Sequence, residues 1–221
     1  MYADQQQMLA KKKLTAGIVC IAAGVLMALT FFLPWLKVTA KRGGGEVTMT
    51  LLSIEACGGK RCESMSNFKL ADDLADGYAK AKEYYDQAIR EGEGAFAGRE
   101  PKKPGTLFPI FGLLTLIVGV VAVGALIASG ALALKGRFIT RPVALTSVAM
   151  IATGLTLVIG CVFLATKPDG EGFRLGVSWP FFLFGATVVG AIVGVQMAAK
   201  AFAPPEYDPY ADPMAPPPAA G

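Results

Sequence analysis

Two cysteines of the chain have a spacing that suits a local disulfide. Cys57 and Cys62 are separated by Gly58-Gly59-Lys60-Arg61, and the adjacent glycines allow the backbone to turn sharply. A bond that closes so short a loop would contribute about 2 kcal/mol on the loop-entropy model. We predict a structural disulfide between Cys57 and Cys62, provided that this part of the chain lies in an oxidising compartment.

The sequence offers little equipment for catalysis or metal binding. The chain has no His, which is the commonest acid/base group, and it carries no P-loop, nucleophile elbow, zincin or dinucleotide motif. Cys20 and Cys161 lie in apolar stretches, so no further thiolate is available to join Cys57 and Cys62, whose spacing also differs from the redox C-x-x-C. We therefore expect no enzyme, no cofactor and no metal site.

Four long apolar stretches of the chain must position the cysteine pair. They cover residues 14–36, 107–134, 143–166 and 177–200, and only the terminal Lys200 is charged. Each exceeds the roughly 20 residues that cross a bilayer core. The chain is 53% hydrophobic, with a mean hydropathy of +0.49. The sequence predicts an all-α membrane protein, a four-transmembrane-helix bundle, without the intramembrane charges that usually mark a transport path.

Basic residues predict how the chain crosses the membrane. They gather before the first span, between the second and third, and after the fourth: Lys11, Lys12, Lys13, Lys135, Arg137, Arg141 and Lys200. Short basic segments stay in the cytoplasm. Segments 1–13, 135–142 and 201–221 are therefore predicted inside, and loops 37–106 and 167–176 outside, in a plasma or bacterial inner membrane.

Two alternatives, a nucleic-acid partner and a cleaved signal peptide, are disfavoured by the sequence. The chain has a net charge of +4, and these basic residues lie beside the spans. Their position argues against a nucleic-acid partner and leaves membrane lipid as the expected contact. A cleaved signal peptide would have an apolar core of about 7–15 residues, and the first stretch is longer. An uncleaved span is the preferred interpretation.

Aromatic residues gather at the predicted outer ends of the spans. Trp35 ends the first stretch and Trp179 opens the fourth, and we interpret both as interfacial anchors at the headgroup level. Pro34, next to Trp35, should end or kink the first helix.

Small residues at every fourth position would keep one face of a helix flat, so that a neighbour can approach closely. Two spans carry such runs: Ala16, Cys20, Gly24 and Ala28 in the first, and Ala186, Gly190, Gly194 and Ala198 in the fourth. We interpret them as helix-packing faces, either between spans of one chain or in a homo-oligomer.

The long loop 37–106 has its own structure. Residues 46–57 alternate in hydropathy, which predicts a strand, and residues 67–91 have the periodicity of an amphipathic helix with Asn67 as its N-cap. The apolar stripe of this helix must cover its own loop, the membrane surface or a protein partner.

The tail 201–221 holds seven of the 14 prolines and includes Pro204-Pro205-Glu206-Tyr207, a P-P-x-Y form that WW domains bind. It is either such a ligand or an extended solubilising segment.

Four spans, a large first outer loop with a cysteine pair and a short second loop resemble the tetraspan topology of claudins and peripheral myelin proteins. The claudin signature G-L-W is absent, because Leu51-Leu52-Ser53 stands in its place. Phe32-Leu33-Pro34-Trp35 is also similar to small bacterial four-span proteins of unknown function.

The leading functional hypothesis is a non-enzymatic membrane scaffold or accessory subunit that binds a protein partner through the loop or the proline-rich tail. The alternatives are an oligomeric pore or small transporter, and a claudin-like adhesion protein.

Overall fold

The structure is a computed structural model that describes residues 2–39, 46–58, 61–92, 98–135, 142–168 and 175–202. These residues form five helices and one small antiparallel sheet. Four of the helices are long and apolar enough to cross a membrane, which indicates an integral membrane protein.

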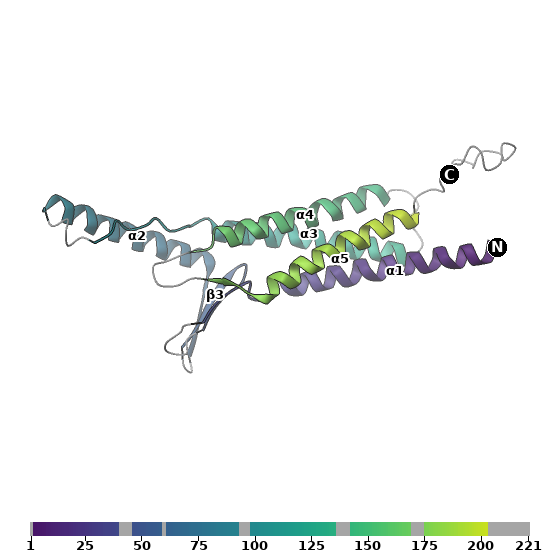
Figure 1. The fold of residues 1–221 in the computed structure, drawn as a ribbon, viewed down its shortest axis with the longest axis horizontal. Coiled ribbons are helices and arrows are strands. Elements are labelled where there is room, and N and C mark those ends of the chain that lie inside the picture. Colours follow the sequence, from purple (N-terminus) through teal and green to yellow (C-terminus); the bar gives the residue numbers. More distant parts are fainter. Residues whose placement is uncertain are drawn as a thin grey trace.

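The four long helices lie side by side in an elongated bundle (Figure 1). They are α1 (Tyr2–Thr30), α3 (Phe108–Leu134), α4 (Pro142–Ala165) and α5 (Trp179–Phe202). Helix α1 packs against α3 and α5, while α4 packs mainly on α3 and also contacts α5. The start of α1 and the end of α5 lie at one end of the bundle, and the sheet lies at the other (Figure 1).

The first helix begins and ends earlier than the predicted span 14–36. Helix α1 ends at Thr30, where single turns join Phe31 N to Ala28 O (3.3 Å) and Leu33 N to Thr30 O (3.3 Å). Pro34 then has no N–H to continue the ladder, and proline disfavours the helical conformation of the residue before it. Residues 36–39 consequently leave the helix and form a strand.

The sheet has the strand order β4-β3-β2-β1-β5, and all its pairs are antiparallel. The strands are β1 (Leu36–Thr39), β2 (Glu46–Met49), β3 (Ser53–Gly58), β4 (Arg61–Ser66) and β5 (Gly176–Val177). The single strand predicted over residues 46–57 is therefore two strands. Thr50 causes the break, because its hydroxyl oxygen accepts from the backbone N–H of Ser53 (3.0 Å) and closes a turn.

The second loop adds a strand to this sheet. In β5, Val177 pairs with Leu36 and Gly176 with Lys37. Ser178 N also donates to Trp35 O (2.8 Å), and the ammonium of Lys167 donates to Leu175 O. The two loops thus form one unit at one end of the bundle.

Helix α2 (Asn67–Arg90) follows β4 directly. Its N-cap is Ser66, whose Oγ accepts from Lys69 N (3.2 Å), so the assignment of Asn67 as the cap was wrong by one residue. Asn67 is buried instead, and its Nδ2 donates to Thr50 O (3.1 Å). This bond ties the first turn of α2 to the turn between β2 and β3.

Candidate functional site

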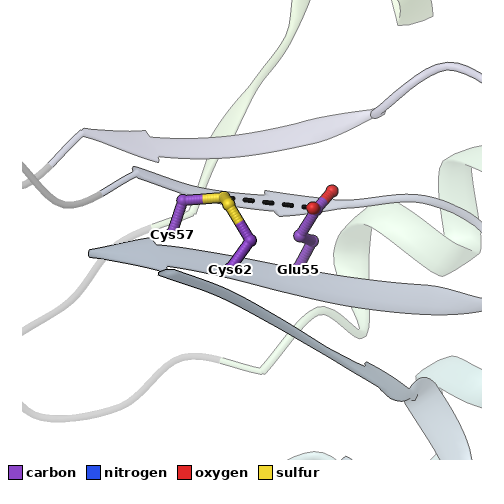
Figure 2. Close-up of a disulfide and its surroundings, with 3 residues drawn as sticks. All are labelled: Glu55, Cys57 and Cys62. Carbon is purple, nitrogen blue, oxygen red and sulfur yellow. Dashed lines mark hydrogen bonds between the residues drawn. A yellow bond between two sulfur atoms is a disulfide. The ribbon is translucent and has the colours of Figure 1, made fainter. Parts of the chain in front are cut away.

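The predicted disulfide is present and closes the β3–β4 hairpin (Figure 2). Cys57 and Cys62 lie opposite each other in the register of the two strands, with Sγ atoms 2.08 Å apart. The cross-link joins the edge strand β4 to its only neighbour in the described sheet. The hairpin therefore keeps a fixed shape although most of its side chains are exposed.

Glu55 lies beside the disulfide, on the same face of β3 as Cys57 (Figure 2). Its Oε1 is 3.9 Å from Cys57 Sγ. The donor atoms of Glu55, Cys57 and Cys62 lie within 4.8 Å of one another, which is close enough to surround a metal ion. Both sulfurs are used in the S–S bond, however, and metals bind thiolates. While the disulfide is intact, one carboxylate is the only effective ligand in this group.

Helix α2 projects beyond the end of the bundle (Figure 1). Its first turns pack on the sheet and on α3, where Ala71 is buried and Leu74 half-buried. Farther along, Tyr85 is half-buried and Ala88 is buried, while the side chain of Tyr84 is 71% exposed and that of Ile89 is 48% exposed. The predicted apolar stripe is therefore covered over part of its length, and the exposed apolar side chains of the outer half are Tyr84, which lies beside the stripe, and Ile89, which ends it.

One ion pair joins the outer half of α2 to the segment 98–107, which leads to α3. Lys82 Nζ lies 3.1 Å from Glu100 Oε1 and 3.5 Å from Asp86 Oδ1. The hydrogen bond to Glu100 and the charge of Asp86 raise the pKa of Lys82. Both ion pairs are exposed, and the pair with Asp86 lies within α2, so they contribute little stability.

Trp35 connects the sheet to the bundle, which corrects its interpretation as an interfacial anchor. Its side chain is 0% exposed, and Nε1 donates to Thr30 O (2.8 Å). Its backbone N donates to Met49 O (2.9 Å) in β2. A buried indole needs such a partner for its N–H. Because α1 ends at Thr30, before Trp35, the side chain of Trp35 lies inside the bundle.

Aromatic rings from α4 and α5 surround Trp35. The ring centroid of Phe184 lies 4.8 Å from that of Trp35, and those of Phe181 and Phe163 lie at 5.5 and 6.3 Å. Gly160 leaves room for the indole, because a Cβ there would lie 3.0 Å from Trp35 Cζ3. The cluster joins three spans to the start of β1.

Trp179 occupies a different environment. It is the first residue of α5 and its side chain is 64% exposed. Phe182, one turn later, and Phe32, just after α1, are also exposed. An exposed tryptophan at the end of a span has the placement of an interfacial anchor.

The small-residue runs make one close contact between α1 and α5. A Cβ on Gly194 would lie 3.1 Å from Cys20 Sγ and 3.0 Å from Val19 Cγ1. Ala16 and Ala198 are also buried. Gly24 instead faces α3, where a Cβ would lie 3.1 Å from Ile127 Cγ1, and Ala28 is half-buried.

The outer half of the run in α5 lies away from this contact. Ala186 is exposed, and Gly190 has open space around its Cβ position among the described residues. The reason is geometric: with 3.6 residues per turn, each step of four residues rotates by about 40°, so a strict four-residue run drifts off one face. Phe184 and Val188 take the buried positions instead.

Residues 203–221 of the proline-rich tail, including Pro204 to Tyr207, lie outside the described residues, as do the basic residues Arg137 and Arg141 of the link between α3 and α4. The first turns of α1 and the cations Lys135 and Lys200 lie at the end of the bundle opposite the sheet.

No protein-family model matches the chain, and no curated protein matches it in sequence.

Proposed function

We propose that the protein is a membrane scaffold or accessory subunit that presents its sheet and α2 on the outside and keeps both termini in the cytoplasm. The observation that carries this proposal is the exposure of Tyr84 and Ile89 in the outer half of α2, whose first turns pack on a cross-linked sheet that is joined to the spans through Trp35. A rigid support for exposed aromatic and aliphatic side chains suits protein binding.

The proposed orientation rests on the basic residues. Lys11, Lys12 and Lys13 belong to the first turns of α1, and Lys135 and Lys200 lie at the same end of the bundle. Cytoplasmic segments next to spans are enriched in such cations. The disulfide at the other end agrees with an oxidising exterior.

Thiol labelling tests the orientation. In a Cys20→Ala/Cys161→Ala background, we expect an impermeant maleimide to label Cys57 and Cys62 on intact cells after mild reduction, and to give almost no label before it. The unreduced sample is the control. Labelling that appears only in inverted vesicles would reverse the proposed orientation.

The apolar part of the partner surface is expected to include Tyr84. Truncating a tyrosine at the centre of an interface costs more than about 1 kcal/mol, or at least about a fivefold loss of affinity. Tyr84→Ala should therefore strongly reduce recovery of a partner that co-purifies with the wild-type protein in mild detergent. Quantitative mass spectrometry of the eluates measures the difference.

Glu83→Ala is the matched control, because Glu83 is an exposed neighbour on the same helix. It should retain the partner. Equal recovery with Tyr84→Ala and the wild type would remove α2 from the interface. A homo-oligomer that conducts ions in liposomes would favour the pore instead.

A claudin-like adhesion role is the second candidate. It is favoured by the disulfide hairpin of the first loop and by the short second loop, which agree with the tetraspan resemblance. Aggregation of cells that express the protein, lost on reduction of the hairpin, would distinguish this role from that of a subunit within one membrane.

A further inference from the structure

One face of the β3–β4 hairpin gathers three side chains that can bind a metal ion once the disulfide is opened. Side chains of a strand alternate between its two faces, so Glu55 lies on the same face as Cys57, two residues later. Cys62 stands directly opposite Cys57 in the register and shares that face (Figure 2). One carboxylate oxygen and the two sulfurs lie within 4.8 Å of one another. We call Glu55, Cys57 and Cys62 the hairpin cluster.

Strand pairing keeps the two cysteines together without help from the S–S bond. Strands β3 and β4 pair from Ser53↔Ser66 to Gly58↔Arg61, and β3 also pairs along β2. The Cα atoms of Cys57 and Cys62 are 4.1 Å apart, as neighbours in this register. Reduction of the disulfide therefore leaves two thiols side by side on the face that also carries Glu55.

The ligand types and their reach suit zinc. Thiolates bind Zn²⁺ at about 2.3 Å and carboxylates at about 2.0–2.2 Å, and two thiolates on one tetrahedral ion lie roughly 3.8 Å apart. Once the S–S bond is open, a small rotation of each cysteine side chain gives this separation. Glu46 pairs with Cys57 in the register, but its carboxylate lies 2.8 Å from the ammonium of Lys37. The fourth position of the ion is therefore left to water.

We infer that the hairpin cluster is a redox-gated site for Zn²⁺. A dithiol, such as the reduced active site of a thiol–disulfide oxidoreductase, gives two electrons and two protons to the Cys57–Cys62 bond. The S–S bond becomes two thiols, and the dithiol becomes a disulfide. Binding of Zn²⁺ releases the two thiol protons, and the Glu55 carboxylate is the third protein ligand. Exchange with an oxidised disulfide reverses these steps and expels the ion.

Cobalt(II) is a spectroscopic probe of this site in the purified full-length protein. We use a Cys20→Ala/Cys161→Ala background, in which Cys57 and Cys62 are the remaining cysteines of the chain. A phosphine reductant is applied and then removed without air. We expect the reduced protein to bind Co²⁺ with thiolate-to-cobalt charge-transfer absorption, which Zn²⁺ should abolish by displacement. The oxidised protein should give no such absorption. Its absence after reduction would overturn the inference.

Glu55→Gln distinguishes a three-ligand site from a simple pair of thiols. It keeps both cysteines and the size of the side chain but removes the carboxylate ligand. The Zn²⁺ affinity of the reduced protein should fall at least about tenfold, because loss of even an outer-shell partner costs about 10–100-fold. Competition with a colorimetric chelator measures the affinity. Equal affinities of Glu55→Gln and the parent protein would overturn the inference.

Glu63→Gln is the matched control. Glu63 is an exposed carboxylate of the same hairpin, but it adjoins Cys62 in the strand and so belongs to the opposite face. The variant should leave the Zn²⁺ affinity nearly unchanged. A loss as large as that of Glu55→Gln would show a general effect of negative charge and would contradict a defined site.

The inference does not rest on the proposed partner, and its outcomes are separable from those of the proposed function. Glu55→Gln should leave recovery of the partner through Tyr84 unchanged, and Tyr84→Ala should leave the Zn²⁺ affinity of the reduced protein unchanged.

Discussion

Trp35→Ala is expected to lower the free energy of unfolding by about 3–5 kcal/mol, the range for removal of a buried large aromatic side chain. The side chain is fully buried among Phe163, Phe181 and Phe184, and its loss leaves a cavity where the sheet meets the bundle. Denaturation in mixed detergent micelles, followed by the fluorescence of Trp179, measures the change.

Two further variants separate the contributions of Trp35. Trp35→Phe keeps most of the apolar volume and removes the Nε1 hydrogen bond to Thr30 O, so we expect a loss of about 1 kcal/mol from the bond and a smaller packing loss. Trp179→Ala removes an exposed indole and should cost less than about 1 kcal/mol when unfolding is followed by far-UV circular dichroism. If Trp179→Ala costs as much as Trp35→Ala, the assignment of Trp35 to the core is wrong.

Gly112→Ala is expected to destabilise the protein by more than about 2 kcal/mol, although it adds a single methyl group. An ideal Cβ at Gly112 would lie 2.1 Å from the carbonyl oxygen of Leu51. The obstacle is backbone in the turn between β2 and β3, so no rotamer change can relieve it. The turn must move away from α3, which should also make the sheet more sensitive to limited proteolysis.

Gly124→Ala is the control on the same helix. Apart from its chain neighbours and the backbone of its own helix, no described atom lies within 4 Å of an ideal Cβ at Gly124, and alanine has the better helix propensity. The variant should be neutral or more stable by up to about 1 kcal/mol. The two alanine variants should therefore shift the denaturation midpoint in opposite directions or by very different amounts, and equal midpoints would contradict the close approach of Leu51 to α3.

Several features of the molecule follow from local sequence. Composition predicts the four long apolar helices, because about 20 uncharged apolar residues suffice for each. Helical periodicity predicts α2 to within about a turn, and the spacing of Cys57 and Cys62 predicts their bond. In each case the deciding interactions lie within a few residues of one another along the chain.

The sheet was only partly predictable. Strand β4 has the sequence Arg61-Cys62-Glu63-Ser64-Met65-Ser66, which lacks the usual β-branched and aromatic residues, and the disulfide partner is its strongest signal. Strand β5 has two residues and carries no pattern of its own. Pairing with β1 defines it, and that pairing joins residues about 140 positions apart.

The sequence by itself determined where the chain is apolar enough to enter a membrane, where it turns and which cysteines can meet, because these properties depend on neighbouring residues. Only the tertiary structure decided which way equivalent residues face. Trp35 and Trp179 both end apolar stretches, yet one is buried and the other exposed. Gly112 and Gly124 share one helix, yet only Gly112 meets another backbone. Pro34 marks locally where α1 stops, but the segments that pack around Trp35 and Gly112 come from distant parts of the chain, and no local pattern encodes them.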